Sequence, residues 1–155
     1  MTVREIILLR HAHAESQKPG QPDLERPLDP RGVDEAEAAG AWLKEKSVLP
    51  ARILCSPALR AQQTLERALG AVAAISEPRI YEASAGELIA LIDDNADVPR
   101  LLLVGHNPGF ETLVALLATG QSGDFRGVPP AGVAWFEIDG TVEPGAGRLE
   151  AFWSP

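Results

Sequence analysis

An arginine and two histidines follow the first apolar segment of the sequence, residues 5–9. They are Arg10, His11 and His13. The guanidinium of arginine binds phosphate oxygens through two parallel N–H groups, and the imidazole of histidine can attack phosphorus when it is neutral. A nearby cation favours the neutral imidazole, because a second positive charge beside it is unfavourable. These residue types at this spacing predict a site for phosphoryl chemistry.

Two further apolar segments end in a similar way. The segment at residues 51–55 is followed by Ser56 and Arg60, and a later one is followed by His106 and Asn107. A histidine at the end of one strand is more often structural than catalytic. All three histidines of the chain, however, lie just beyond apolar segments, and this coincidence favours one shared site.

The elements that must position these residues alternate between strand and helix. Short apolar runs predict strands at Glu5–Leu9, Ala51–Cys55, Arg79–Tyr81, Leu101–Val104 and Val133–Ile138. Helical periodicity predicts helices at Gly32–Lys46, Ala58–Leu69, Ser84–Asp93 and Gly109–Ala118. This alternation predicts an α/β fold, a three-layer α/β/α sandwich whose mainly parallel central sheet is covered on both faces. Such sheets bind ligands beyond the carboxyl ends of their strands, where the candidate residues lie.

The longest polar connection runs from His13 to Gly32 and contains four prolines. This composition predicts a loop, and a loop of this length inside a compact domain is more often functional than idle. In the helix that follows, we expect Gly40 to allow close packing on the sheet.

Length and composition indicate one soluble domain over residues 1–155. The chain is 45% hydrophobic and 23% charged, and no stretch approaches the roughly 20 apolar residues of a membrane helix. The N-terminus lacks a signal-peptide pattern and Cys55 is the only cysteine, so we expect a cytoplasmic protein with no membrane partner. A formal net charge of -8 argues against nucleic acid as a partner, because nucleic-acid binders need a basic face.

Four blocks of sequence, in order, resemble one known family. The segment Leu9-Arg10-His11-Ala12 resembles the Arg-His-Gly signature of the histidine phosphatase superfamily. The other blocks are DLERPL at 23–28 with RG at 31–32, SPALRAQQT at 56–64 and VGHNP at 104–108. In so short a chain, the combination is similar to the SixA-type phosphohistidine phosphatases. The resemblance covers nearly the whole chain and implies a phosphoglycerate mutase-like fold.

The resemblance also implies roles for the matching residues. His11 would be the nucleophile and become transiently phosphorylated. Arg10 and Arg60 would hold the phosphoryl oxygens, and His106 would stabilise the transferring group. Ala12 stands where the superfamily usually has glycine; it is the smallest change from glycine, although it disfavours a positive φ.

The resemblance leaves the proton donor open. Many members of the superfamily place a glutamate after the third strand, and Glu82 is the positional match. Glu15 and solvent are the alternatives, because a phosphoramidate depends less on an acid than an ester does. Ser56, Asn107 and His13 are further candidates for substrate binding, with His13 in an accessory or surface role.

The expected reaction is a double displacement at phosphorus that uses no metal and no cofactor. His11 attacks the phosphoryl group, and water then releases phosphate from the phosphohistidine. A cleft without long insertions is expected to be open, which favours phosphohistidine in a protein, such as a signalling phosphotransfer domain, as the substrate. A small phosphate ester as the substrate, and a non-catalytic phosphate-binding module, are the alternatives.

A cysteine-based phosphatase is a further rival, since Cys55 precedes a helix and Arg60. Such enzymes place one residue more between the cysteine and the arginine than the four found here. Pro57 also removes one of the N–H donors that would surround the phosphate. We therefore expect Cys55 to be a buried hydrophobic side chain.

Overall fold

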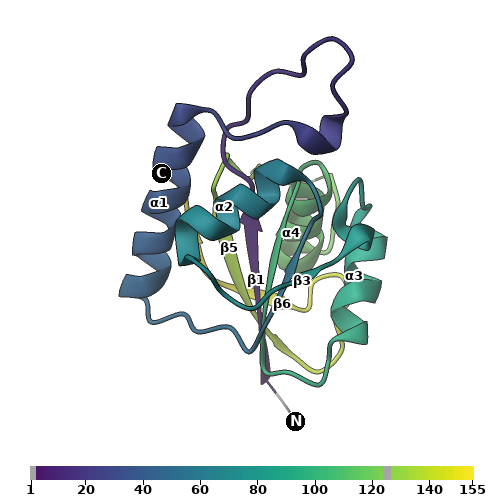
Figure 1. Cartoon of the computed structure of the whole chain (residues 1–155). Coiled ribbons are helices and arrows are strands. Elements are labelled where there is room, and N and C mark those ends of the chain that lie inside the picture. The colour runs from purple at the N-terminus through teal and green to yellow at the C-terminus, as the bar shows by residue number, and fades with distance from the viewer. Residues whose placement is uncertain (1–2, 124–126) are drawn as a thin grey trace.

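The structure, a computed structural model, describes residues 3–123 and 127–155 (Figure 1). Within these residues the centre is one six-stranded sheet in the order β3-β2-β4-β1-β5-β6. Its strands are β1 (Val3–Arg10), β2 (Arg52–Cys55), β3 (Ile75–Ser76), β4 (Arg100–Gly105), β5 (Val133–Asp139) and β6 (Gly147–Trp153). The pairings among β1 to β4 are parallel, whereas β5 pairs antiparallel with both β1 and β6. The predicted mainly parallel sheet is confirmed.

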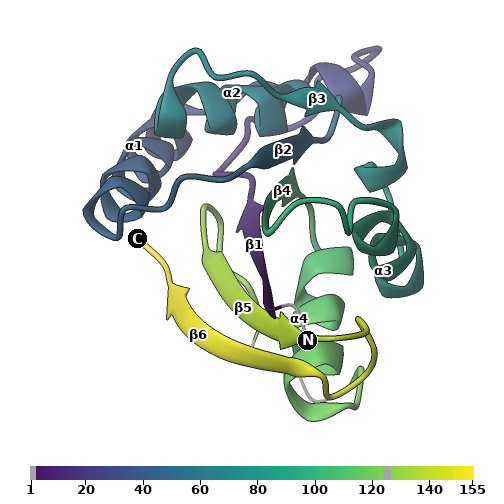
Figure 2. The ribbon, with the colours of Figure 1, turned by 90° about the horizontal axis from the view of Figure 1, so that it is seen from below.

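Helices cover both faces of this sheet. They are α1 (Pro30–Glu45), α2 (Leu59–Leu69), α3 (Ala85–Asp94) and α4 (Gly109–Thr119). α1 and α2 lie on one face, and α3 and α4 lie on the other (Figure 2). Alternate residues of β1 face the two layers: Ile6 and Leu8 belong to the core with α3 and α4, and Ile7 and Leu9 to the core with α1 and α2. The predicted three-layer fold is confirmed. None of the helices in the described residues has both the length and the apolar character needed to cross a membrane.

The parallel strands bring distant segments of the chain to one edge of the sheet. β4 lies between β1 and β2, and Arg10 of β1 is level with Gly105 of β4. The main chain continues this pairing beyond the strands. The N–H of His11 donates to the carbonyl oxygen of Gly105 at 3.0 Å, and the N–H of Ser56 donates to that of Val104 at 3.0 Å. The segments that carry the candidate residues therefore start side by side.

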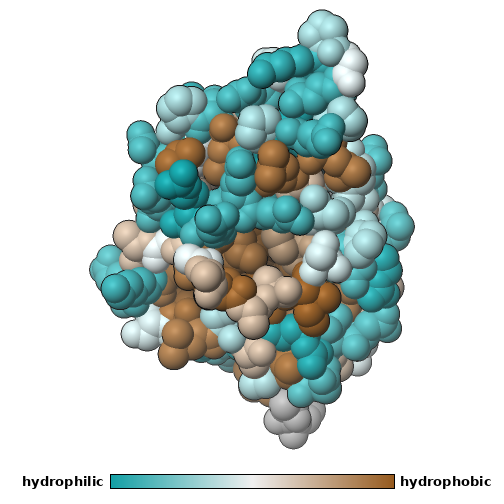
Figure 3. All heavy atoms as spheres, in the orientation of Figure 1, coloured by the Kyte–Doolittle hydropathy of each residue, from teal (hydrophilic) through white to brown (hydrophobic). Residues whose placement is uncertain are grey.

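The connection between β1 and α1 projects beyond this edge of the sheet (Figure 1). It contains a short 3-10 helix, η1 (Asp23–Glu25), and the projecting end of the molecule is mainly hydrophilic (Figure 3). The connection ends at Asp29, whose side chain accepts a hydrogen bond from the N–H of Gly32 at 2.7 Å. Pro30 follows with its φ already suited to a helix, so α1 begins two residues earlier than predicted.

The predicted strand at Arg79–Tyr81 is wrong. Residues 78–80 form a 3-10 helix, η2 (Pro78–Ile80), and the third strand is the short β3 that precedes it. Pro78 has no N–H to donate to a sheet. The carboxylate of Glu77 accepts the N–H of Arg79 at 3.0 Å and caps the helical turn instead. β6, the edge strand that completes the sheet, was not predicted.

Gly40 of α1 packs against the neighbouring helix α2 rather than against the sheet, as had been expected. A Cβ at this position would lie 2.0 Å from the carbonyl oxygen of Ala68, which belongs to α2. The glycine therefore lets α1 approach α2 closely, and the expectation that it faces the sheet is wrong.

Candidate active site

A cavity of about 470 Å³ lies at the carboxyl edge of β1 and β4. The predicted residues that line it are Arg10, His11, Arg60, Glu82, His106 and Asn107. They come from the end of β1, the first turn of α2, the segment after η2 and the segment between β4 and α4. The structure thus brings together side chains from four separate parts of the sequence.

The ring of His11 is held by the main chain. Its Nδ1 lies 2.7 Å from the carbonyl oxygen of Ala12. Because a carbonyl oxygen only accepts hydrogen bonds, Nδ1 carries the proton and the lone pair of the neutral ring is on Nε2. Burial, together with the charges of Arg60 and Arg10, lowers the pKa of His11 to about 4. The ring is therefore neutral at physiological pH, as a nucleophile requires.

His106 lies beside His11, with the two ring centroids 5.1 Å apart. Its Nε2 is 2.7 Å from the hydroxyl oxygen of Ser56, which also accepts the N–H of Ala58 at 3.2 Å. The hydroxyl hydrogen of Ser56 is available to donate to Nε2, and this pairing places the proton of a neutral His106 on Nδ1. Burial is the main cause that lowers the pKa of His106 to about 3. His106 is thus a neutral ring with one N–H to offer.

Arg10 and Arg60 contribute two cations to the wall of the cavity. Nη1 of Arg10 donates to the carbonyl oxygen of Val128 at 2.8 Å. Nη1 and Nη2 of Arg60 donate to the carbonyl oxygen and the carboxylate of Asp23 at 2.8 and 2.9 Å. The Nε groups of both arginines are buried and have no hydrogen-bond partner in the described part of the chain. Two guanidinium groups on one cavity wall fit an anion with several acceptor oxygens, such as a phosphoryl group.

The two carboxylates considered as proton donors lie in different places. Glu82 lines the cavity, and its φ of 58° is in the left-handed region, which side-chain-bearing residues seldom adopt. The carboxylate of Glu15 lies outside the cavity, 3.8 Å from Nζ of Lys18. The placement favours Glu82.

Three further candidates have partners within the fold. Ser56 is fully buried and reaches the site only through His106. His13 lies outside the cavity, because its main-chain N–H and its Nδ1 bind the carboxylate of Glu35 at 3.0 and 2.8 Å. Asn107 does line the cavity, but its amide donates to the carbonyl oxygen of Val128 at 2.9 Å. Of these three candidates, only Asn107 lines the cavity, and the position of His13 outside it agrees with the accessory or surface role expected for this residue.

Asp23, Arg26 and Tyr81 line the cavity but were not predicted as site residues. The carboxylate of Asp23 accepts hydrogen bonds from Arg26 at 3.0 Å and from Tyr81 at 2.6 Å. A signal for Asp23 and Arg26 was present, because both belong to the block at 23–28 that carries the family resemblance. Tyr81 had no such signal, since it falls in the wrongly predicted strand.

The described residues give no candidate for a metal centre. Across 3–123 and 127–155, no three or more histidine, cysteine, aspartate or glutamate side chains are grouped as metal ligands. The positive charge on the cavity wall comes from Arg10, Arg26 and Arg60.

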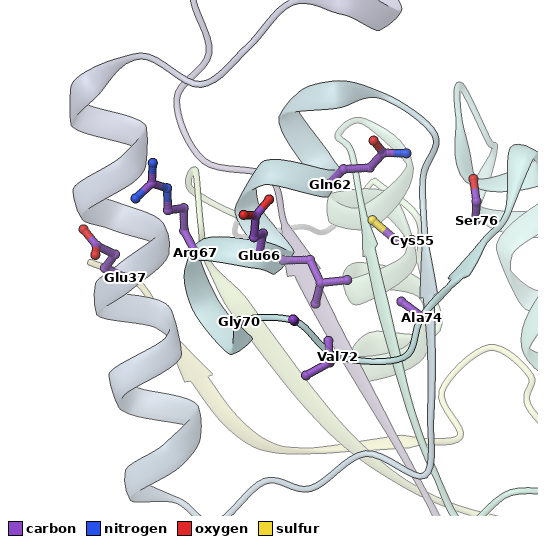
Figure 4. A pocket seen from close by; sticks show the side chains of 11 residues that line it. Glu37, Cys55, Gln62, Glu66, Arg67, Gly70, Val72, Ala74 and Ser76 are labelled. Atoms are coloured by element: carbon purple, nitrogen blue, oxygen red, sulfur yellow. The ribbon is translucent and has the colours of Figure 1, made fainter.

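A larger cavity, of about 740 Å³, lies between α2 and the segment at 70–76 (Figure 4). Its charged side chains are Glu37, Glu66 and Arg67, so an anion would meet a net negative wall. Cys55 also lines it, and burial raises the pKa of this thiol to about 12. The expectation of a buried Cys55 is confirmed. This cavity is larger than the one around His11 but lacks groups suited to phosphoryl chemistry.

Sequence comparisons agree with the geometry. The family model described as "Histidine phosphatase superfamily (branch 1)" matches residues 6–103, which include His11 and Arg60 and end before His106. Protein Rv1276c of Mycobacterium tuberculosis (strain H37Rv) is 38% identical, and the match covers 92% of this chain and 98% of the relative. Phosphohistidine phosphatase SixA of Escherichia coli (strain K12) is 30% identical, and the match covers 76% of each chain.

A solved structure has the same fold over nearly the whole chain. It is the protein histidine phosphatase SixA complexed with tungstate, which superimposes with a TM-score of 0.82. The two sequences are 28% identical, and the match covers 97% of each chain. Tungstate is a tetrahedral oxyanion, as phosphate is.

Proposed function

Because the chain belongs to the histidine phosphatase superfamily (branch 1), we propose that it removes phosphoryl groups through a covalent intermediate on His11, and that its substrate is phosphohistidine in a protein. The main support for the proposal is the protonation state of His11. Its Nδ1–H is bound to Ala12, and burial together with the charges of Arg60 and Arg10 lowers its pKa to about 4. An uncharged nucleophile with its lone pair on Nε2 therefore lies in a cavity lined by arginines.

In the first step, Nε2 of His11 attacks phosphorus and the bond from phosphorus to the substrate nitrogen breaks. Arg10 and Arg60 neutralise charge on the phosphoryl oxygens, and His106 donates its Nδ1–H to one of them. The leaving imidazole takes a proton, for which we assign Glu82 as the donor. His11 keeps its hydrogen on Nδ1, bound to the main chain.

In the second step, a water molecule attacks the phosphorylated His11, the N–P bond breaks and inorganic phosphate leaves. The Glu82 carboxylate takes a proton from this water, which restores its starting state. Nε2 regains its lone pair. The positive charge in both steps comes from the arginines, so no step is assigned to a metal ion or a cofactor.

The choice of a protein as substrate rests on the relatives and on the position of the cavity. Two relatives are named as a phosphohistidine phosphatase and a protein histidine phosphatase. The cavity lies at the carboxyl edge of the sheet, and Asp23 and Arg26 of the connection between β1 and α1 line part of it. This connection projects beyond the same edge of the sheet (Figure 1). A side chain on the surface of a folded partner can reach such a position. We further propose a single cytoplasmic domain over residues 1–155, in a reducing compartment where Cys55 stays unpaired.

The test measures phosphate release from three substrates: a phosphotransfer protein that carries phosphohistidine, a sugar phosphate and an aryl phosphate. His11→Ala removes the nucleophile. His13→Ala is the matched control, because His13 lies outside the cavity and binds Glu35. We expect fast release from the protein substrate with the parent chain and with His13→Ala, and release at background level with His11→Ala.

Other outcomes have distinct meanings. Fast release from a small phosphate ester alone would agree with His11 as the nucleophile but contradict phosphohistidine in a protein as the substrate. Release by His11→Ala at the parent rate would contradict the nucleophile. No release from any of the three substrates would favour a phosphate-binding module.

A further inference from the structure

Asp23, the first residue of η1, has a carboxylate that three side chains bind. Its Oδ1 accepts from Nη1 of Arg26 at 3.0 Å. Its Oδ2 accepts from Nη2 of Arg60 at 2.9 Å and from the hydroxyl of Tyr81 at 2.6 Å. The carbonyl oxygen of Asp23 also accepts from Nη1 of Arg60 at 2.8 Å. Asp23 therefore holds both terminal nitrogens of Arg60.

These contacts tie together three segments that are far apart in the sequence. Asp23 belongs to the connection between β1 and α1, Arg60 lies in the first turn of α2, and Tyr81 directly follows η2. Tyr81 in turn packs edge-on against His106, with ring centroids 5.7 Å apart. One carboxylate thus fixes an arginine of the cavity directly and a histidine of the cavity through Tyr81.

The charge of Asp23 suits this arrangement. The hydrogen bond from Tyr81, together with those from Arg26 and Arg60, holds the pKa of Asp23 well below its usual range. At neutral pH the group is a carboxylate, which only accepts hydrogen bonds. The side chain of Arg60 is only 7% exposed. With its terminal nitrogens engaged in this way, the orientation of its remaining N–H groups, including the unpaired Nε, is fixed.

We propose that Asp23 is a positioning residue, which holds Arg60 directly, and His106 through Tyr81, in the arrangement that the transferring phosphoryl group requires. This inference rests on the proposed function. Asp23 is itself an anion and would repel the phosphoryl oxygens, so it acts through the groups that it holds. Small displacements of such groups slow a reaction strongly. Removal of the carboxylate is therefore expected to slow the chemical step although Arg10, Arg60 and His106, which bind the phosphoryl oxygens, are all still present.

The test measures single-turnover phosphorylation of His11 by the phosphohistidine protein. We expect Asp23→Asn to lower the rate constant about 10- to 100-fold and Tyr81→Phe, which removes one of the three donors, to lower it by a smaller factor. The amplitude, which reports the fraction of molecules able to react, is expected to stay unchanged. Asp97→Asn is the matched control, because Asp97 binds both terminal nitrogens of Arg52, at 2.7 and 2.8 Å, on an exposed surface.

A merely structural role of Asp23 gives a different pattern. Partial unfolding lowers the amplitude and the melting temperature but leaves the rate constant of the folded molecules unchanged. A rate constant for Asp23→Asn equal to that of the parent would overturn the proposal, and so would a loss of amplitude alone. If Asp23→Asn does not fold, Tyr81→Phe decides by the same two criteria.

A second measurement separates this inference from the proposed function. In NMR spectra, the terminal N–H groups of Arg60 are expected to rotate slowly in the parent chain and fast in Asp23→Asn, with no substrate present. Fast rotation in the parent would overturn the positioning role. Slow rotation in a parent chain that forms no phosphoenzyme would instead overturn the proposed function. Asp23 would then hold Arg60 in place without a role in phosphoryl transfer.

Discussion

The ring of His11 donates its Nδ1–H to the carbonyl oxygen of Ala12, the next residue, over 2.7 Å. Ala12 is fully buried, and its own N–H donates to the hydroxyl oxygen of Thr64 in α2 at 3.0 Å. The tautomer of His11 is thus set by its neighbour in sequence, and that neighbour is fixed by a helix. The same helix contains Arg60, so α2 positions both the proposed nucleophile and one of the arginines of the cavity.

Activity is expected to persist at pH 5. Burial, with the charges of Arg60 and Arg10, lowers the pKa of His11 to about 4, so protonation removes the nucleophile only near and below that pH. A histidine with the ordinary pKa would keep only about 3% of its neutral form at pH 5. The measurement is kcat/KM as a function of pH, which reports the groups of the free enzyme. An acid limb with a midpoint near the ordinary value of about 6.5 would contradict this assignment.

Ser56→Ala is expected to lower kcat about tenfold. The variant removes the hydroxyl that lies 2.7 Å from Nε2 of His106, so the ring can place its proton on either nitrogen. Ser76→Ala is the matched control, because Ser76 ends the neighbouring strand β3 and is exposed. Equal kcat values for both variants and the parent chain would show that Ser56 does not orient His106.

Cys55→Ala is expected to leave kcat unchanged and to lower the free energy of unfolding by about 1 kcal/mol, through the small cavity it creates. Cys55 is 4% exposed, and burial raises the pKa of its thiol to about 12, so iodoacetamide is also expected to leave the folded chain unmodified. Steady-state rates, urea unfolding and mass spectrometry check these points. Loss of activity in the variant would return cysteine chemistry to consideration.

Gly40→Ala is expected to lower the free energy of unfolding by about 1 to 3 kcal/mol. The added Cβ would lie 2.0 Å from the carbonyl oxygen of Ala68, so α1 and α2 must separate. Gly86→Ala, in α3, is the matched control. Its Cβ would meet nothing nearer than Oγ of Ser84 at 4.0 Å, and alanine favours a helix over glycine by up to about 1 kcal/mol, so this variant is expected to gain stability. If urea unfolding shows that both variants change the free energy of unfolding in the same direction, the packing described for Gly40 is contradicted.

Burial on both faces of the sheet made most of the elements predictable. The apolar run of β4, for example, indicates a strand covered on both sides, and β4 does lie inside the sheet. The order of the strands could not be predicted, because no local pattern states that β4 rather than β2 lies beside β1. The error at η2 has a local cause, since Pro78 excludes a strand and favours the helical turn that Glu77 caps.

The candidate site was predictable where polar side chains follow apolar strands. His11 and His106 each interrupt a run that belongs in the core, so their positions at the edge of the sheet can be inferred from sequence. Asp23 and Tyr81 come from irregular segments and are 58 residues apart. An acidic residue in a polar loop is usually solvated, and only the path of the chain shows that this one binds two arginines and a tyrosine.

The most direct test of the whole mechanism is to identify the atom that carries the phosphoryl group. The chain is mixed with a protein that bears radiolabelled phosphohistidine, quenched rapidly in alkali and digested, and the labelled residue is mapped and its phosphoimidazole isomer assigned by NMR. We expect transient label on Nε2 of His11 in the parent chain and in His13→Ala, and none in His11→Ala. Label on another residue, label on Nδ1 of His11, or release of phosphate without any labelled intermediate would contradict the proposed mechanism.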